Sequence, residues 1–308
     1  MHGCGVPGTL CILTIKRKDE AKPLIFDLTR AVIHLKSVKS RIFDEKYGYV
    51  RIVNFSRDTG KDLRENLLTL KKDNPKGLIL DLRSNPGGLL QGAVEVSSMF
   101  LPKDDLVVYT QGRIPSSNAK YYTNQEPIFP KIPLIVLINQ GSASASEIVS
   151  GAIRDNKRGI LLGMKSFGKG SVQHIFPLLD SSSLVVTVSK YYTPSGVVIH
   201  EKGLTPDVVI EIPKKKKETT EKDELGEEDP EKEDDFLKDI WKEQEEEEER
   251  NNHDQDDKQE EPAEEGTEEE ELSEEEKLKK ENAEILERDY QLKKALELLD
   301  VSDILGGK

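Results

Sequence analysis

The sequence has little of what holds together disulfide-rich, zinc-binding or membrane-spanning proteins. Its 308 residues include two cysteines, Cys4 and Cys11, too few for a disulfide framework, and no cysteine–histidine pair has zinc-site spacing. Its longest uninterrupted aliphatic run, residues 134–138, is far below the roughly 20 residues of a membrane-spanning helix. The first residues show neither the basic nor the apolar stretch of an export signal. We therefore expect no disulfide scaffold, zinc site or membrane span.

Aromatic residues are also scarce, at 6%, and the net charge of −14 is unevenly placed. Residues 1–210 carry a net +9, whereas residues 211–308 carry a net −23. Residues 218–276 hold 32 acidic and 6 basic side chains and almost nothing apolar, so hydrophobic burial cannot offset chain entropy there. We predict a disordered acidic linker over residues 213–272, after a folded part of roughly 200 residues.

The apolar pattern of the folded part predicts strands that alternate with helices. Helices are expected at residues 61–72, 89–100 and 147–153, and strands at residues 10–16, 24–28, 48–55, 77–82, 133–138, 159–163 and 183–188. This alternation favours an α/β core with parallel strands joined by crossover helices.

A further helix is predicted at the C-terminal end, over residues 273–308. Ser273 and Glu276 have the spacing of a capping box. Apolar residues then recur every seven positions, a stripe too narrow for a helix that stands alone in water. We expect this helix to pack on another helix or on the core through the stripe residues Leu278, Ile285, Leu292 and Leu299.

Ser144 is the first candidate for chemistry. It lies in a run of small residues, SASAS, between a predicted buried strand and a predicted helix. A serine hydroxyl at such a junction can act as a nucleophile, with a neighbouring amide stabilising an oxyanion. Ser144 and Glu147 also form a capping-box pattern, and that segment alone favours a capping role over a catalytic one.

A nucleophilic serine needs a base, and histidine is a poor candidate here. The five histidines are scattered and the GxSxG pattern is absent, so a Ser-His-Asp hydrolase finds little support. Lys169, flanked by glycines, can serve as the base where burial lowers its pKa. Most lysines are surface residues, which weighs against any single one.

Two glycine-containing segments allow other interpretations. Residues Gly163–Lys169 satisfy the GxxxxGK pattern of a phosphate-binding loop, but Gly170 stands where serine or threonine must hold magnesium, and a strand-like segment follows. Nucleotide binding is therefore a weak alternative. Residues 80–88 predict a strand followed by an Asn-Pro-Gly-Gly turn whose amides can face a ligand, or simply a turn between strand and helix.

Together these segments resemble the carboxyl-terminal processing peptidases, also called tail-specific proteases, which are serine enzymes with a Ser-Lys catalytic pair. Each stretch is weakly specific alone, and the joint match is highly specific. The matching stretches follow the family order across about residues 9–212: GYVRI, LDLRSNPGGLL, VLINQGSASASEIVSGAI, SFGKGSVQ, YYTPSG and GLTPDVVIE.

The resemblance implies a set of site residues. The family nucleophile is the middle serine of SASAS and the base lies 25 residues later in FGKG, which here are Ser144 and Lys169. Gln173 is expected to orient the lysine, and Asp155 to play a supporting part. The oxyanion hole is expected from main-chain amides of Ala145 and of Gly87 or Gly88.

The resemblance also implies the architecture. It indicates a crotonase-like (ClpP/crotonase) α/β protease core over residues 35–212, followed by the acidic linker 213–272 and the amphipathic helix 273–308. Residues 1–34 match only the C-terminal part of a peptide-binding PDZ domain, which we interpret as an N-terminal truncation. The stretch GVVIH at residues 196–200 departs from the polar run that relatives carry.

The expected function is that of a serine endopeptidase that cleaves proteins near their C-termini through an acyl-enzyme, without metal or cofactor. Expected partners are substrate C-termini, an adaptor protein and a second copy bound through the final helix, with no nucleic acid. The resemblance implies a periplasmic or cell-envelope location. A catalytically silent scaffold that recruits partners through its acidic tail and final helix is the other alternative.

Overall fold

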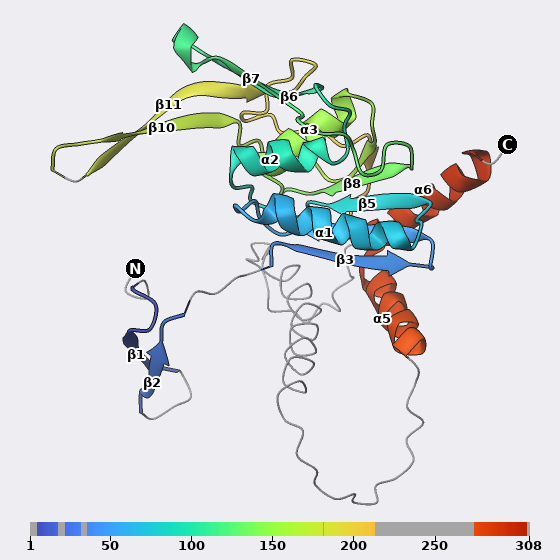
Figure 1. Cartoon of the computed structure of the whole chain (residues 1–308), viewed down its shortest axis with the longest axis horizontal. Coiled ribbons are helices and arrows are strands. Elements are labelled where there is room, and N and C mark those ends of the chain that lie inside the picture. The colour runs from blue at the N-terminus through green and yellow to red at the C-terminus, as the bar shows by residue number, and fades with distance from the viewer. Residues whose placement is uncertain (1–4, 18–21, 32–35, 181, 213–273, 307–308) are drawn as a thin grey trace, which may run out of the picture. The chain divides into compact units, whose positions relative to one another are not determined.

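The computed structural model describes residues 5–17, 22–31, 36–180, 182–212 and 274–306 (Figure 1). The chain divides into two compact units, residues 1–36 and residues 37–308. The predicted acidic linker lies outside the described residues.

The first unit contains the two predicted strands, β1 (Leu10–Ile15) and β2 (Leu24–Thr29). They pair antiparallel, with Leu10 opposite Thr29. Several of their apolar side chains are exposed, among them Ile12 and Ile25, because two strands alone have no second layer against which to bury a face.

The second unit is built on a six-stranded sheet in the order β12-β9-β8-β5-β4-β3. All neighbouring pairs are parallel except β3 and β4, which confirms the predicted α/β core with parallel strands. The strands are β3 (Val38–Phe43), β4 (Tyr47–Ile52), β5 (Gly77–Asp81), β8 (Leu134–Ile138), β9 (Ile160–Gly163) and β12 (Val208–Val209).

Both faces of this sheet are covered, so the central strands β5 and β8 are buried along their whole length. Leu78, Leu80 and Val136 face a cluster formed with α1 (Thr59–Lys72), α2 (Leu90–Ser98) and α3 (Ala145–Asp155). Ile79 and Leu137, one residue out of phase, face a second cluster formed with the C-terminal helix.

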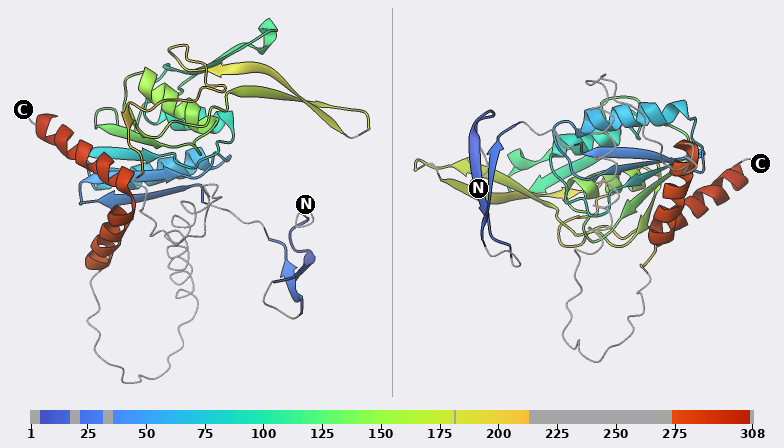
Figure 2. Two further views of the ribbon diagram at one scale, coloured as in Figure 1. Left: turned by 180° about the vertical axis from the view of Figure 1, so that it is seen from behind. Right: turned by 90° about the horizontal axis from the view of Figure 1, so that it is seen from below.

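The C-terminal segment forms two helices where the sequence predicted one. α5 (Glu274–Arg288) and α6 (Tyr290–Gly306) meet at an angle at Asp289, as Figure 2 shows in red. The Asp289 carboxylate accepts a hydrogen bond from the Leu292 amide at 2.9 Å, so this residue caps a new helix instead of continuing the old one.

The predicted packing of the C-terminal stripe is confirmed for three of its four residues, Ile285, Leu292 and Leu299. α6 covers the sheet through the buried side chains of Leu292, Ala295, Leu296 and Leu299. Leu278, in α5, stays exposed.

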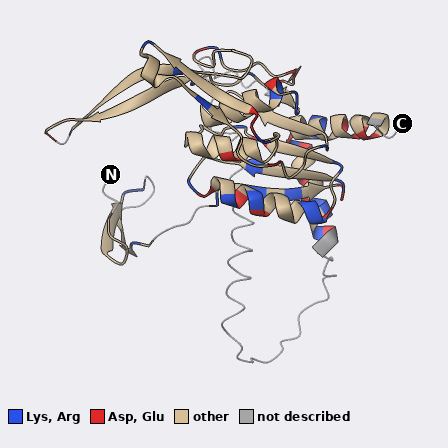
Figure 3. Cartoon of the chain, turned by 45° about the horizontal axis from the view of Figure 1, so that its top comes forward, with Lys and Arg blue, Asp and Glu red and all other residues tan. Residues whose placement is uncertain are grey.

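A second, four-stranded antiparallel sheet has the order β10-β11-β6-β7 and was only partly expected. The hairpin of β10 and β11 projects from the second unit (Figure 1) and is nearly free of charge (Figure 3). Apolar side chains such as Ile175 and Val185 are exposed along it. The strands are β6 (Leu106–Gly112), β7 (Ala119–Tyr122), β10 (Ser171–Pro177) and β11 (Ser183–Tyr192), with a short 3₁₀ helix at Pro115–Ser117.

Candidate active site

Ser144 lies on a strained turn between β8 and α3. Its backbone angles are φ 54° and ψ −111°, which an L-residue adopts at a cost of about 1–3 kcal/mol. The residue is half-buried. A nucleophile held on a sharp strand-to-helix turn is a recurring arrangement in hydrolases.

The turn is fastened to the Asn-Pro-Gly-Gly segment that follows β5. The Asn85 carbonyl oxygen accepts hydrogen bonds from the Ala143 amide at 3.0 Å and from the Ser146 hydroxyl at 2.9 Å. The two loops therefore form one rigid edge at the carboxyl ends of β5 and β8.

Glu147 joins the Ser144 turn to the Lys169 loop. Its side chain is fully buried, and one carboxylate oxygen accepts the amides of Ser144 and Lys169, each at 2.9 Å. The other accepts the Ser166 hydroxyl at 2.5 Å and the Gly168 amide at 2.7 Å. Burial raises the pKa of Glu147 above its usual range, and these hydrogen bonds offset part of that shift.

Lys169 is brought beside Ser144 through its main chain. Its side chain, however, is exposed, so the predicted burial of this lysine is wrong. Residues 164–170 form a surface loop between β9 and β10 and not part of the sheet interior, which leaves the side chain in solvent. Among the described residues no hydrogen bond joins Lys169 Nζ to Ser144 Oγ. Catalytic hydrogen bonds are often long in unliganded sites and tighten when substrate is bound.

Gly87 and Gly88 lie directly against the serine turn. Gly87 has φ 95°, and a Cβ there would lie 2.7 Å from the Ala143 oxygen and 2.8 Å from Ser144 Cβ, so only glycine fits. The Gly87 amide donates to Asn85 Oδ1 at 2.9 Å. In the described part of the chain, the amides of Gly88 and Ala145 have no acceptor, which makes these two the available oxyanion donors.

Gln173 and Asp155 lie away from this junction. Gln173 is exposed on β10 next to a register irregularity, and no hydrogen bond to Lys169 is formed within the described residues. Asp155 lies at the far end of α3, about 16 Å from Ser144 at 1.5 Å per residue. It accepts the Ser195 amide at 3.0 Å and the Ser195 hydroxyl at 2.6 Å, and so pins the Thr-Pro-Ser-Gly turn. Burial raises the pKa of Asp155, but these hydrogen bonds outweigh that effect and lower it overall.

The phosphate-loop alternative does not fit the structure. After Gly163–Lys169 the chain enters the strand β10 (Ser171–Pro177), as the sequence predicted, and not a helix. No helix N-terminus therefore stands where the phosphates of a nucleotide would be held.

The comparison with protein families decides the relationship. A family model described as Peptidase family S41 matches residues 46–210, more than half of the chain and all of the loops just described. The chain belongs to peptidase family S41.

Individual relatives agree with this assignment. A carboxy-terminal-processing protease of Bartonella bacilliformis is 43% identical over 69% of this chain and 50% of its own length. A carboxyl-terminal-processing protease of Synechocystis is 40% identical over 68% of this chain and 49% of its own. The chain thus spans about half the length of the curated relatives it matches.

A solved structure is similar as well. The photosystem II D1 C-terminal processing protease superposes with a TM-score of 0.53 at 30% identity, covering 67% of this chain and 56% of that one. The mixed α/β fold is therefore the fold of an S41 peptidase.

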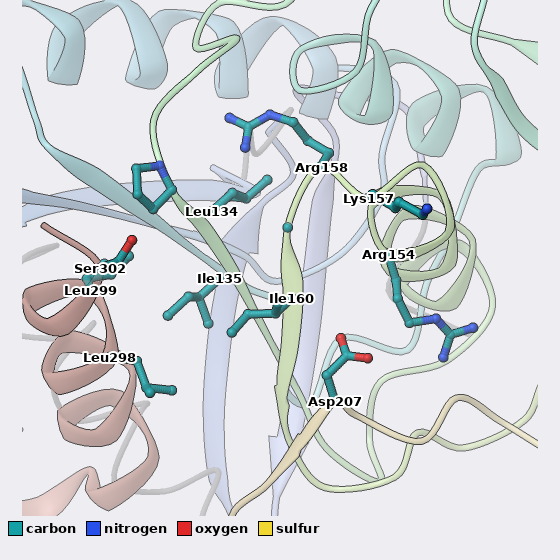
Figure 4. A pocket seen from close by; sticks show the side chains of 12 residues that line it. Leu134, Ile135, Arg154, Lys157, Arg158, Ile160, Asp207, Leu298, Leu299 and Ser302 are labelled. Carbon is teal, nitrogen blue, oxygen red and sulfur yellow. The ribbon is translucent and has the colours of Figure 1, made fainter. Parts of the chain in front are cut away.

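A separate pocket of about 520 Å³ lies at the opposite edge of the S41 core, where β8 and β9 begin (Figure 4). Arg154, Lys157 and Arg158 line one side of it, and Leu298 and Leu299 of α6 the other. Ser144 and Lys169 follow the carboxyl ends of β8 and β9, so this pocket is not the candidate active site.

Two kinds of feature are absent from the described residues. They include no cluster of three or more histidine, cysteine or acidic side chains arranged to hold a metal ion. Within the same residues, no helix has both the length and the apolar character needed to cross a membrane.

The role of Glu147 as the link between the two loops was missed at the sequence level. Its capping-box spacing to Ser144 was visible, but its contacts with Ser166, Gly168 and Lys169 cross about twenty residues of sequence. Nothing in the local pattern indicates them.

Proposed function

We propose that this S41 peptidase is a serine endopeptidase that uses Ser144 as nucleophile and Lys169 as general base to cleave proteins near their C-termini. The observation that carries the proposal is the Glu147 carboxylate oxygen that lies 2.9 Å from the amides of both residues, beside the Gly87–Gly88 turn. Two segments far apart in sequence thus meet at one oxygen, with an accessible hydroxyl and unpaired amides around it.

In the first step, the Lys169 side chain turns from solvent onto Ser144 as a substrate peptide covers the site. Neutral Lys169 takes the Ser144 hydroxyl proton while Oγ attacks the peptide carbonyl carbon. The carbonyl oxygen becomes an oxyanion that the Gly88 and Ala145 amides hold, helped by the positive end of α3.

In the second step, protonated Lys169 gives its proton to the leaving amine, and the C–N bond breaks to leave an acyl-enzyme on Ser144. Water then adds to the ester with Lys169 again as base, which releases the product acid and restores the serine. Gln173, four residues after the lysine and on the adjoining strand, would orient Lys169 in the covered state.

The architecture and setting are proposed from the same resemblance. The core corresponds to a crotonase-like protease domain, and the β1–β2 unit to the last strands of a PDZ domain that would bind substrate C-termini. The printed names of the relatives, carboxyl-terminal-processing proteases, support this substrate class. A periplasmic or envelope location, an adaptor protein and a homodimer through the final helix stay predictions; four apolar residues of α6 are already used within the chain itself.

The test is a comparison of three variants on an unstructured peptide substrate. Ser144→Ala and Lys169→Ala should each lower kcat by at least about a thousandfold, since both groups take part in the bond-making step. Ser150→Ala is the matched control: Ser150 lies in the same helix, and its buried hydroxyl has no hydrogen-bond partner in the described structure.

A fluorophosphonate probe provides a second readout, because it should label the wild type and Ser150→Ala but not Ser144→Ala. Full cleavage by Ser144→Ala would overturn the assignment. A folded wild type that neither cleaves nor takes up the probe would support the silent scaffold instead.

A further inference from the structure

A buried ionic network lies beneath the Asn-Pro-Gly-Gly turn. Arg83 lies two residues after the end of β5 and two residues before Asn85, where the turn begins, and its side chain is 9% exposed. On one side it contacts Asp81, the last residue of β5, and on the other Asp289, the residue that separates α5 from α6. The network therefore joins the central sheet to the C-terminal helix.

Arg83 makes close hydrogen bonds with both carboxylates. Arg83 Nη2 lies 2.6 Å from one carboxylate oxygen each of Asp81 and Asp289. Arg83 Nη1 donates to the other Asp289 oxygen at 2.8 Å, so the Asp289 contact is bidentate. Nη1 also donates to Gln291 Oε1 at 3.2 Å, and Gln291 in turn donates to the Ile210 carbonyl at 2.7 Å.

The junction of α5 and α6 supplies one of the two carboxylates that Arg83 contacts. Arg51 Nη1 is 3.4 Å from Asp81, whose carboxylate also accepts the Tyr49 hydroxyl. Two guanidinium groups thus face the carboxylates of Asp81 and Asp289. Without the Asp289 charge, the buried Arg83 keeps the Asp81 carboxylate, which Arg51 also contacts, and removing one partner of a buried ion pair is far costlier than losing an exposed pair.

The main chain after Arg83 leads straight into the proposed oxyanion turn. Arg51 Nη2 donates to the Arg83 carbonyl at 3.3 Å, and the Ser84 amide donates to Asn139 Oδ1 at 2.7 Å. Ser84 itself has φ 54°, a strained conformation that its neighbours must enforce. A shift of Arg83 is therefore passed to Asn85, whose carbonyl holds the serine turn, and to the glycines beyond it.

We propose that Asp289 is a positioning residue for catalysis: by clamping Arg83 it holds the Ser84–Gly88 turn in the geometry that presents the Gly88 amide to the oxyanion. Helix α6 is then part of the catalytic support and not only a cover for the sheet. This inference rests on the proposed function, in which that amide acts.

The variant that tests it is Asp289→Asn, which keeps the size of the side chain and removes its charge. The matched control is Asp303→Asn. Asp303 lies on α6, the helix that Asp289 caps, and contacts Lys46 and Lys76, which precede β4 and β5 at the other edge of the sheet. Both variants remove one carboxylate that ties α6 to the sheet, but only the first touches Arg83.

Two measurements are made on each variant at a temperature where it is fully folded. Steady-state kinetics on an unstructured peptide should show kcat lowered at least tenfold by Asp289→Asn with KM within twofold, and neither changed by Asp303→Asn. Affinity for a peptide boronate, which forms an anionic tetrahedral adduct with the serine, should fall in parallel with kcat/KM. Arg83→Ala should have the same effect, and the double variant should be no worse than either single one.

Amide hydrogen exchange across residues 82–90 gives a readout independent of activity. Exchange there should rise at least tenfold in Asp289→Asn and stay at the wild-type rate in Asp303→Asn. Wild-type kcat with wild-type exchange in Asp289→Asn would overturn the inference, as would equal effects of the two variants. Wild type and Ser144→Ala are assayed alongside: if they do not differ in cleavage, the proposed function fails, while the exchange rates still decide whether Asp289 holds the turn.

Discussion

At the scale of single residues, the site depends on backbone geometry more than on side-chain identity. Ser144 and Gly87 both have positive φ, and they touch each other. The strain at Ser144 is held by the amide that Ala143 donates to Asn85 and by the carboxylate of Glu147. These contacts can be tested one at a time.

Gly87→Ala should lower activity strongly. The new Cβ would lie 2.7 Å from the Ala143 oxygen and 2.8 Å from Ser144 Cβ, so the serine turn has to move. We expect kcat/KM to fall by about a hundredfold or more, the order of losing an oxyanion donor. Gly196→Ala is the control, because Gly196 has a similar φ of 89° but its nearest atom is 3.5 Å away. It should cost about 1–2 kcal/mol of stability and leave serine labelling intact; equal loss of activity in both would contradict the argument.

Glu147→Gln should destabilise the protein although it is nearly isosteric. Each carboxylate oxygen accepts at least one main-chain amide, so either orientation of the new amide group sets its NH₂ against a donor. We expect unfolding in urea to show a loss of about 3 kcal/mol. Glu65→Gln, which affects an exposed pair with Lys61, should stay within about 0.5 kcal/mol of wild type. A wild-type unfolding midpoint for Glu147→Gln would contradict this role.

At the scale of elements, α6 is the helix whose place matters most. It was predicted as the second half of one long helix. It instead begins at Tyr290 after the cap Asp289, and packs on the face of the sheet opposite α1, α2 and α3. The apolar seven-residue stripe, expected to pack on another helix or on the core, packs on the core of the chain itself. Of the predicted stripe, Leu292 and Leu299 are among the most buried residues of the chain.

Leu292→Ala should therefore lower the free energy of unfolding by about 2–5 kcal/mol, the cost of a cavity in a core. Leu305→Ala, on the same helix and 67% exposed, should change it by less than about 0.5 kcal/mol. Thermal or urea unfolding of both variants checks the difference. If the two were equally mild, α6 would not be docked in solution.

At the scale of the whole molecule, the buried network makes stability depend on acid pH. Burial alone would raise the pKa of Asp81, but Arg83 and Arg51 outweigh it and lower that pKa to about 2. A carboxyl group whose pKa is lower in the folded state stabilises the protein above its ordinary pKa of 3.8, and this contribution is lost as pH falls toward 2.

We expect the free energy of unfolding to fall by about 2 kcal/mol between pH 4 and pH 2 from Asp81 alone. Glu147 has the opposite effect on stability, at higher pH. Because its pKa is raised in the folded state, its contribution to the free energy of unfolding decreases as pH rises past 4.5. Urea unfolding at half-unit pH steps separates the two. Stability that stays level or increases from pH 4 to pH 2 would contradict the assigned network.

Much of this protein followed from local pattern. Period-two and apolar runs located the strands near 48–55, 77–82 and 133–138, and helical spacing located 61–72 and 89–100, each within a few residues of the observed bounds. Burial on both faces of a parallel sheet produces those runs whatever the rest of the chain does. The order of short motifs was likewise enough to indicate the family, because that order is a property of the chain itself.

The tertiary structure decided what depends on contacts between distant segments. Glu147 accepts the Lys169 amide from 22 positions away, and Asp289 binds Arg83 from 206 positions away. The exposure of Lys169 likewise depends on where the fold places its loop. A carboxylate's partners are set by which loops the sheet brings to one edge, and hydrogen bonding leaves no periodic trace in sequence. For that reason local sequence patterns were enough to indicate the candidate site residues. Only the folded sheet determined which groups hold those residues in place.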